Sequence, residues 1–164
     1  MSTPAIPLNE FDQEMAATRR LLERVPSDKG EWKPHAKSFA LGHLAQLVAR
    51  MPGWFTLMLR QPSLDLAAGP RYSFETTDTL LQEFDRHVSE SRQALQEVTG
   101  AALSEPWSLT AGPQVLMTQP KDAVVRQTMS HLAHHRGQLT VYLRLLDIPI
   151  PSIYGPTADE GWGG

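Results

Sequence analysis

Three of the six histidines in the 164-residue sequence fall close together, at His131, His134 and His135. If this stretch is helical, side chains four residues apart lie on the same face, so His131 and His135 point in one direction. Two imidazoles at this spacing can bind one metal ion, at about 2.0–2.1 Å per nitrogen, without bending the helix. His134 points away from this line, and we expect it to face solvent. The spacing therefore predicts part of a divalent-metal site.

A third ligand must come from another part of the chain. The sequence has no cysteine, so the ligands have to be His, Asp or Glu. His43 is the best candidate, because it lies one turn before Leu47, beside the apolar stripe of an earlier helical segment. Three neutral nitrogen ligands with an open position are typical of a catalytic metal, whereas structural zinc sites are closed by four ligands. Imidazoles bind zinc, nickel, copper and iron alike, so the residues alone do not select the ion.

Each of these histidines also has a structural interpretation. A pair at this spacing occurs on polar helix edges, where the imidazoles are solvated or hydrogen-bonded. A single histidine such as His43 beside an apolar face is commonly a packed core residue. His35 and His87 are expected to have no special role. Spacing alone leaves the metal site and the structural interpretation open.

Residues that could form a substrate pocket lie near the proposed ligands. Gln138 and Tyr142 continue the line of the histidine pair along the helix and could orient a bound ligand. Trp54 is expected to lie in the core or to line a pocket. We therefore predict a pocket formed by Trp54, Gln138 and Tyr142. The walls that would decide the substrate are aromatic: Trp32, Trp54, Phe55 and Trp107.

Two charged groups bear on catalysis. Arg50 and Arg136 could hold an anion near the site, but Arg136 points off the line of the ligands, which favours a structural ion pair. No acidic residue lies at a convincing spacing from the histidine pair to act as a general base. The sequence therefore assigns no catalytic residue.

Apolar residues at helical spacing predict four helices. A kink or short break is expected at Pro52-Gly53, and residues 106–118 are expected to form a short irregular hairpin. The simplest packing is an all-α four-helix bundle with a small β-hairpin insertion before the last helix. The predicted helices run from Leu8 to about Val25, from Ser38 to Gln61, from Thr77 to Val98 and from Lys121 to about Leu146, with loops at 62–75 and a surface tail at 152–164.

Length and charge narrow the class of protein. The 164 residues match the usual size of one domain, so 1–164 is expected to be a single domain. A net charge of −3, without a long run of Lys or Arg, argues against a nucleic-acid partner. No apolar run reaches the roughly 18 residues of a membrane span, and no signal peptide is seen. We expect a cytoplasmic protein with no membrane partner.

The histidine-containing segments resemble a known family. The stretch His131-x-x-x-His135-Arg136-Gly137-Gln138 resembles the signature near the C-terminus of the DinB-like (DinB/YfiT) family of metal-dependent bundle proteins. The segment Leu41-Gly42-His43-Leu44 is similar to the segment that supplies that family's first ligand. The stretch 148–155 also resembles many members, and the similarity covers most of the chain in element order.

This resemblance implies a four-helix bundle with an up-down-down-up connection and frequent homodimers. It implies a metal, usually zinc or nickel, on His43, His131 and His135. Some relatives are thiol S-transferases or thiol-dependent isomerases, so the implied substrate is a small molecule, with a low-molecular-weight thiol as one candidate. Such a thiol would have to be supplied from outside, because the chain has no cysteine.

Two functions follow from these observations. The first is a metal-dependent enzyme of hydrolase or thiol transferase type, in which the ion activates water or a thiol as a nucleophile. The alternative is a non-catalytic metal- or small-ligand-binding homodimeric module of a stress response, in which the ion contributes only folding energy. The missing general base favours the module, and the open coordination position favours the enzyme. We prefer the enzyme.

Overall fold

The computed structural model describes residues 6–69 and 71–162. Within these ranges the chain is mostly helical and carries one small sheet, and no helix there is both long and apolar enough to cross a membrane. The elements, in chain order, are α1 (Leu8–Leu22), η1 (Ser27–Lys29), α2 (Leu41–Arg60), β1 (Ser63–Asp65), η2 (Leu66–Ala68), α3 (Thr77–Glu97), α4 (Gly100–Leu103), β2 (Pro106–Ala111), β3 (Gln114–Pro120) and α5 (Lys121–Leu145).

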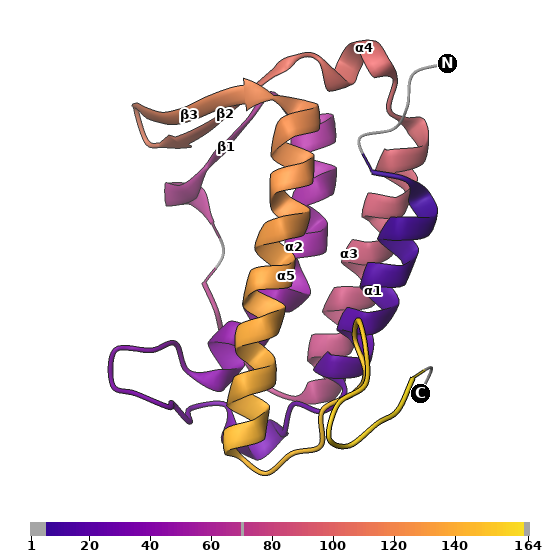
Figure 1. The fold of residues 1–164 in the computed structure, drawn as a ribbon. Helices are drawn as coiled ribbons and strands as arrows, with labels where there is room; N and C mark the ends of the chain where they lie inside the picture. Colours follow the sequence, from indigo (N-terminus) through magenta and orange to yellow (C-terminus); the bar gives the residue numbers. More distant parts are fainter. Residues whose placement is uncertain (1–5, 70, 163–164) are drawn as a thin grey trace.

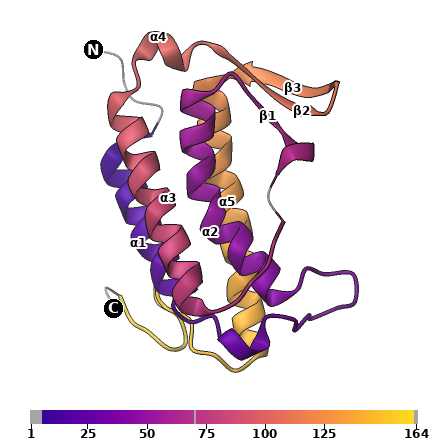
Figure 2. The same cartoon turned by 180° about the vertical axis from the view of Figure 1, so that it is seen from behind.

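The long helices α1, α2, α3 and α5 lie side by side, with the sheet at one end (Figures 1 and 2). Helix α2 packs against α3 and α5, and α1 packs against α3. In the core between them, the rings of Phe11 and Phe55 meet edge to face at 5.6 Å. Each long helix lies where apolar spacing predicts it. Helix α2 continues through Pro52-Gly53 without a break, and the carbonyl of Pro52 accepts a hydrogen bond from Ser91 of α3.

The sheet confirms the predicted hairpin and adds a strand to it. Strands β2 and β3 pair in antiparallel fashion, with an irregularity between Leu109 and Thr110. Strand β1, within a segment expected to be a loop, pairs in parallel with β2. This strand has only three residues, and its partner lies more than forty positions later in the chain. No local pattern of apolar residues could therefore have indicated it.

Helix α5 is joined to α1 by a buried arginine. The guanidinium of Arg136 donates a hydrogen bond to the carboxylate of Glu14 at 2.6 Å and to the hydroxyl of Thr18 at 2.9 Å. Arg136 is one of the largest fully buried side chains among the described residues. Because a buried cation needs a paired anion, these contacts confirm the interpretation of Arg136 as a structural residue.

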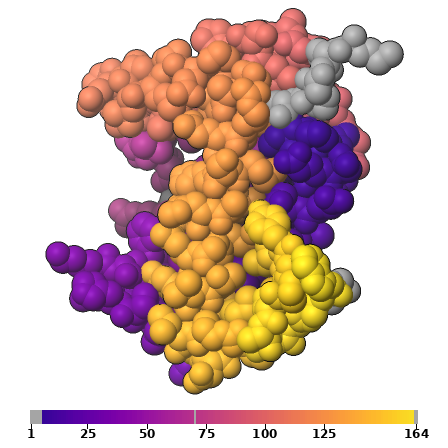
Figure 3. Space-filling model, in the orientation of Figure 1, coloured from indigo at the N-terminus to yellow at the C-terminus, as the bar shows by residue number. Residues whose placement is uncertain are grey.

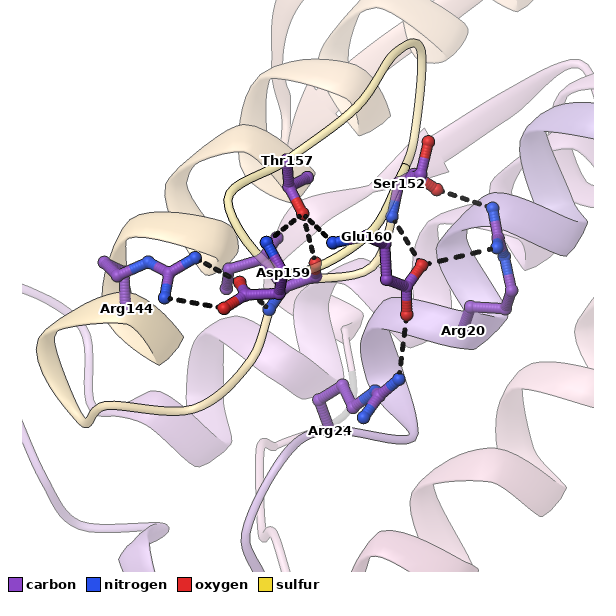
Figure 4. A network of polar contacts seen from close by, with 8 residues as sticks. Arg20, Arg24, Arg144, Ser152, Thr157, Asp159 and Glu160 are labelled. Atoms are coloured by element: carbon purple, nitrogen blue, oxygen red, sulfur yellow. Dashed lines mark hydrogen bonds and ion pairs between the residues drawn. The ribbon is translucent and has the colours of Figure 1, made fainter. Parts of the chain in front are cut away.

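The segment after α5 is held against the helices by its acidic side chains (Figure 4). Asp159 forms an ion pair with Arg144 of α5. Glu160 pairs with Arg24, just beyond α1, at 3.1 Å. The segment lies on the surface, as expected of 152–164, but it is fixed there by these contacts and links α5 to the end of α1.

Candidate metal centre

The rings of His131 and His135 meet on one face of α5, as their spacing predicts. Their Nε2 atoms lie 2.9 Å apart. The other ring nitrogen of His135, Nδ1, lies 2.8 Å from Oε1 of Gln138, one turn further along the helix. With Nδ1–H donating to this amide oxygen, the lone pair of His135 is on Nε2. The Nε2–H of His131 then donates to this lone pair, so the two ring nitrogens face each other in a hydrogen bond that a bound metal ion would replace.

Gln138 has the position of a residue that orients a metal ligand. Metal-binding histidines usually donate their second ring N–H to a carbonyl or carboxylate oxygen, which fixes the tautomer and the ring orientation. The amide of Gln138 provides this contact to His135. The sequence placed Gln138 in a substrate pocket, whereas in the structure its contact is with a proposed ligand. His134 is exposed, as expected, and its ring meets that of His135 edge-on at 5.0 Å.

His43 lies on α2, the helix that packs against α5. Its imidazole is stacked between two aromatic rings, those of Phe39 at 4.4 Å and Tyr72 at 4.1 Å, with interplanar angles of 9° and 17°. The guanidinium of Arg50 lies over the ring of Tyr72, 5.0 Å from its centroid. His43 is thus held by stacking.

The structure brings two of the three predicted ligands together. Across the described residues 6–69 and 71–162, no cluster of three His, Asp or Glu side chains is arranged to hold a metal ion. His131 and His135 form a pair, and His43 lies within its aromatic stack. The three-histidine site therefore stays a prediction, and it requires His43 to approach the pair.

Burial and neighbouring positive charges keep two of these imidazoles neutral. Partial burial lowers the pKa of His43 below its ordinary value, and the positive charge of Arg50 lowers it further. Partial burial also lowers the pKa of His131, with the neighbouring His135 adding to the effect. A histidine must be deprotonated to bind a metal. The lowered pKa values of His43 and His131 favour the neutral form that a metal ligand requires.

The residues predicted to line a substrate pocket have separate positions. Trp54 lies on α2 with its ring 5.7 Å from that of His131, and it lines cavities on both of its sides. The hydroxyl of Tyr142 donates to the carbonyl of Phe39 at 3.3 Å, and its ring meets Trp32 edge-on at 5.8 Å. Tyr142 thus supports the segment that precedes α2, and it lines neither cavity beside Trp54.

Sequence reasoning missed the two rings that enclose His43. Phe39 stands four positions before His43, within the helix predicted from Ser38, so this spacing could have indicated the contact, although α2 begins only at Leu41. Tyr72 belongs to the connection between the sheet and α3, and it carries no local signal. Its contact with His43 depends on how that connection folds back over α2.

Comparison with known proteins identifies the family of this chain. The DinB family model matches residues 1–162, and the chain belongs to the DinB family. The chain is 27% identical over 158 residues to the uncharacterized protein YrdA of Bacillus subtilis, a match that covers 93% of this chain and 89% of YrdA. The family resemblance seen in the histidine motifs is confirmed.

Solved structures share the fold. A DinB-like protein of Bacillus subtilis, YjoA, superposes with a TM-score of 0.70 at 19% identity, over 89% of this chain and 96% of that one. A DinB-like protein of Bacillus cereus gives a TM-score of 0.70 at 18% identity, over 90% and 95% of the two chains. A mycothiol-dependent maleylpyruvate isomerase gives a TM-score of 0.56 at 16% identity, over 84% of this chain and 63% of the isomerase.

Proposed function

We propose that this protein is a divalent-metal-dependent enzyme whose ion is held by His43, His131 and His135. The observation that carries the proposal is the convergence of the His131 and His135 Nε2 atoms, 2.9 Å apart, with Gln138 fixing the orientation of the second ring. Zinc and nickel are the preferred ions, because the family resemblance implies them and imidazole ligands suit both. When bound with an open position, such an ion acts as a Lewis acid and lowers the pKa of a coordinated water or thiol.

The chain's own residues would prepare this site. Gln138 holds the His135 tautomer that presents Nε2. Phe39 and Tyr72 hold the His43 ring in a stack, from which it would have to approach the pair. Trp54 lies beside His131, with the two rings 5.7 Å apart.

A low-molecular-weight thiol is the proposed co-substrate. The chain has no cysteine, so a thiol nucleophile must come from another molecule. One structural neighbour is a mycothiol-dependent isomerase, which supports a thiol-related reaction on this fold. A hydrolase that activates water at the same ion is the second form of this proposal.

A non-catalytic binding module is the alternative. No acidic side chain forms an ion pair with His43, His131 or His135 in the parts of the chain that the structure describes. An enzyme at this site would therefore need its base from the ion-bound group itself. In the module, the ion would only stabilise the fold.

The proposal includes two structural properties that the family resemblance implies, namely the connection of the helices and the oligomeric state. We propose the up-down-down-up connection of a four-helix bundle, supported by the packing of α1 on α3 and of α2 on α3 and α5. We also propose a homodimer, supported by the exposed apolar residues Val141 and Leu145 on the outer side of α5. Light scattering of the purified protein at several concentrations would measure its mass.

Metal content tests the site. Untagged wild-type protein and the variants His43→Ala, His131→Ala and His135→Ala are loaded with zinc or nickel, desalted and measured by elemental analysis. We expect about one ion per chain in the wild type and near-background content in the three variants. His134→Ala, on the same turn of α5, is the matched control and should keep its metal. Stoichiometric metal in either His131→Ala or His135→Ala would disprove the site.

Catalysis is tested separately from metal binding. Metal-loaded protein is incubated with glutathione, bacillithiol or mycothiol and with chlorodinitrobenzene, from which thiol attack displaces chloride. Adduct formation faster than in the buffer control, and lost in His43→Ala, would support the enzyme. Equal rates for the wild type and His43→Ala would refute metal-dependent catalysis of this reaction and would favour the module.

A further inference from the structure

A cavity of about 470 Å³ lies between α2, α5 and the sheet, with His131 at its edge. Its size is within the range of roughly 300–1,000 Å³ that holds drug-sized ligands. Figure 3 shows that the surface beside α5 is hollowed between the sheet and the segment that precedes α2. The cavity walls are formed mainly by Met58, Leu64, Trp107, Leu109, Met117 and Val124.

The cavity wall contains no Asp, Glu, Lys or Arg. Apart from the indole nitrogens of Trp54 and Trp107, its polar side-chain groups all belong to α5 and are Gln127, Thr128 and His131. The hydroxyl of Thr128 is already used, because it donates to the carbonyl of Val124 at 2.9 Å. Gln127 is exposed to solvent, and within the described ranges its amide has no hydrogen-bond partner in the protein. A ligand would therefore meet apolar walls and one available amide beside His131.

A charged ligand is disfavoured here, because burying an unpaired charge is costly. On the other side of Trp54 lies a second cavity, of about 670 Å³, with a different character. Its lining includes the charged side chains of Arg50, Glu83, Arg86 and Glu90. Trp54 thus separates a cavity without formal charges from one rich in them. An anionic or zwitterionic molecule would find partners only in the second.

The cavity is open to solvent, so a ligand would enter it by displacing water. Water fills a cavity well only where it finds two to four polar partners. Walls of Met58, Leu109 and Met117 do not provide them. An apolar molecule gains free energy by leaving water for such walls.

We propose that this cavity binds an uncharged, largely apolar organic molecule, with its one polar end at Gln127 and His131. The inference deepens the proposed function, on which it rests, by naming the class of substrate: a neutral apolar electrophile delivered to the His131 side of the metal site. The ring of Trp54 lies 5.7 Å from that of His131 and forms part of the same cavity wall.

The test uses a neutral fluorescent probe, N-phenylnaphthylamine, and its charged analogue, anilinonaphthalene sulfonate, on the full-length chain. We expect saturable binding of one neutral probe per chain, with energy transfer from tryptophan, and at least tenfold weaker binding of the sulfonate. Met117→Glu places a carboxylate in the cavity wall and should weaken binding of the neutral probe at least tenfold. Val115→Glu, on the same strand but 60% exposed and outside the cavity, should change it less than twofold.

The measurements are made on metal-free protein and repeated on His135→Ala, whose ring does not line the cavity. The proposal requires the neutral probe to bind in both, so a failed metal site and a failed cavity give different results. Equal affinity for the two probes, or equal weakening by Met117→Glu and Val115→Glu, would overturn it. Circular dichroism shows that each variant is folded, and Met117→Leu should bind like the wild type if Met117→Glu fails to fold.

Discussion

The guanidinium of Arg136 on α5 lies 2.6 Å from the carboxylate of Glu14 on α1, and both side chains are withdrawn from water, with exposed fractions of 2% and 17%. The same guanidinium also contacts Thr18 and Tyr154. In the family resemblance Arg136 directly follows a proposed metal ligand, yet its side chain extends away from the histidine pair to α1. Its role is to join the two helices.

Removal of Glu14 is expected to destabilise the fold without affecting the metal site. Glu14→Ala leaves the buried Arg136 charge without its partner, and breaking such a pair costs about 3–5 kcal/mol. Gln13→Ala, at an exposed position on the same helix, should stay within about 0.5 kcal/mol of the wild type. Urea unfolding measures both. A cost below about 1 kcal/mol for Glu14→Ala, or a parallel loss of metal content at native conditions, would contradict this assignment.

Gly53 is expected to be required by its neighbour on α3. A Cβ added at Gly53 would meet the imidazole of His87 closer than non-bonded atoms can approach. Gly53→Ala should therefore destabilise the protein by about 1 kcal/mol or more, as overpacking does, despite the better helix propensity of Ala. At Gly137 on α5 a Cβ meets no atom within 4 Å. Gly137→Ala should instead stabilise by up to about 1 kcal/mol.

The contact between Gly53 and His87 is tested by a double-mutant cycle in thermal or urea unfolding. In a His87→Ala background the space opens, so Gly53→Ala should become neutral or stabilising. If its cost were the same in both backgrounds, the clash with His87 would not be its cause.

The free energy of unfolding should fall as the pH is lowered below 6.5, the ordinary pKa of histidine. Burial lowers the pKa of His87 below 6.5 in the folded state, and the positive charge of Arg86 lowers it further, against opposing effects of Glu83 and Glu90. Below pH 6.5 the unfolded chain therefore binds more protons than the folded one, and the free energy of unfolding decreases until the folded pKa is passed. The contribution is complete above pH 6.5.

His87→Phe keeps an aromatic ring and removes the titration. We expect a flatter dependence of the unfolding free energy on pH below 6.5 than in the wild type, measured on metal-free protein. His35→Phe, at an exposed position, is the control and should leave the slope unchanged. An unchanged slope in His87→Phe would show that this histidine does not respond to burial.

The segment after α5 should detach from the helices at a pH below the range in which histidine titrates. A hydrogen bond from Arg144 holds the pKa of Asp159 below its ordinary value of 3.8, and the backbone N–H of Ile150 contributes. Because the folded pKa is depressed, the stabilisation is present above pH 3.8 and is lost as the pH falls through the folded value. Asp159→Asn should remove it at neutral pH and speed proteolysis of residues 147–162, whereas Glu31→Gln should not. Equal cleavage rates would argue against the role of Asp159.

The parts of the fold that depend on local pattern could be predicted. Helix α5 and the meeting of His131 with His135 follow from a four-residue spacing, which fixes the geometry within one element. Strand β1 and the stacking of Tyr72 on His43 could not be predicted, because both depend on which distant segments fold together. The fixed tail was also missed, since the partners of Asp159 and Glu160 lie on other elements.

The cavity beside His131 also could not be predicted from the sequence. Its walls come from α2, α5 and all three strands, and no stretch of sequence encodes such a space. The sequence predicted aromatic pocket walls but not where the pocket lies. Of the four aromatic residues named for these walls, Trp54 and Trp107 line this cavity.

The stack around His43 has a consequence for the kinetics of metal uptake under the proposed function. For this imidazole to join the pair on α5, Phe39 and Tyr72 must shift with it or release it. Uptake would then proceed in two stages, rapid capture by His131 and His135 followed by a rearrangement of the protein. The observed rate in stopped-flow mixing should level off as the metal concentration rises, and replacement of Tyr72 by a small residue should raise that plateau.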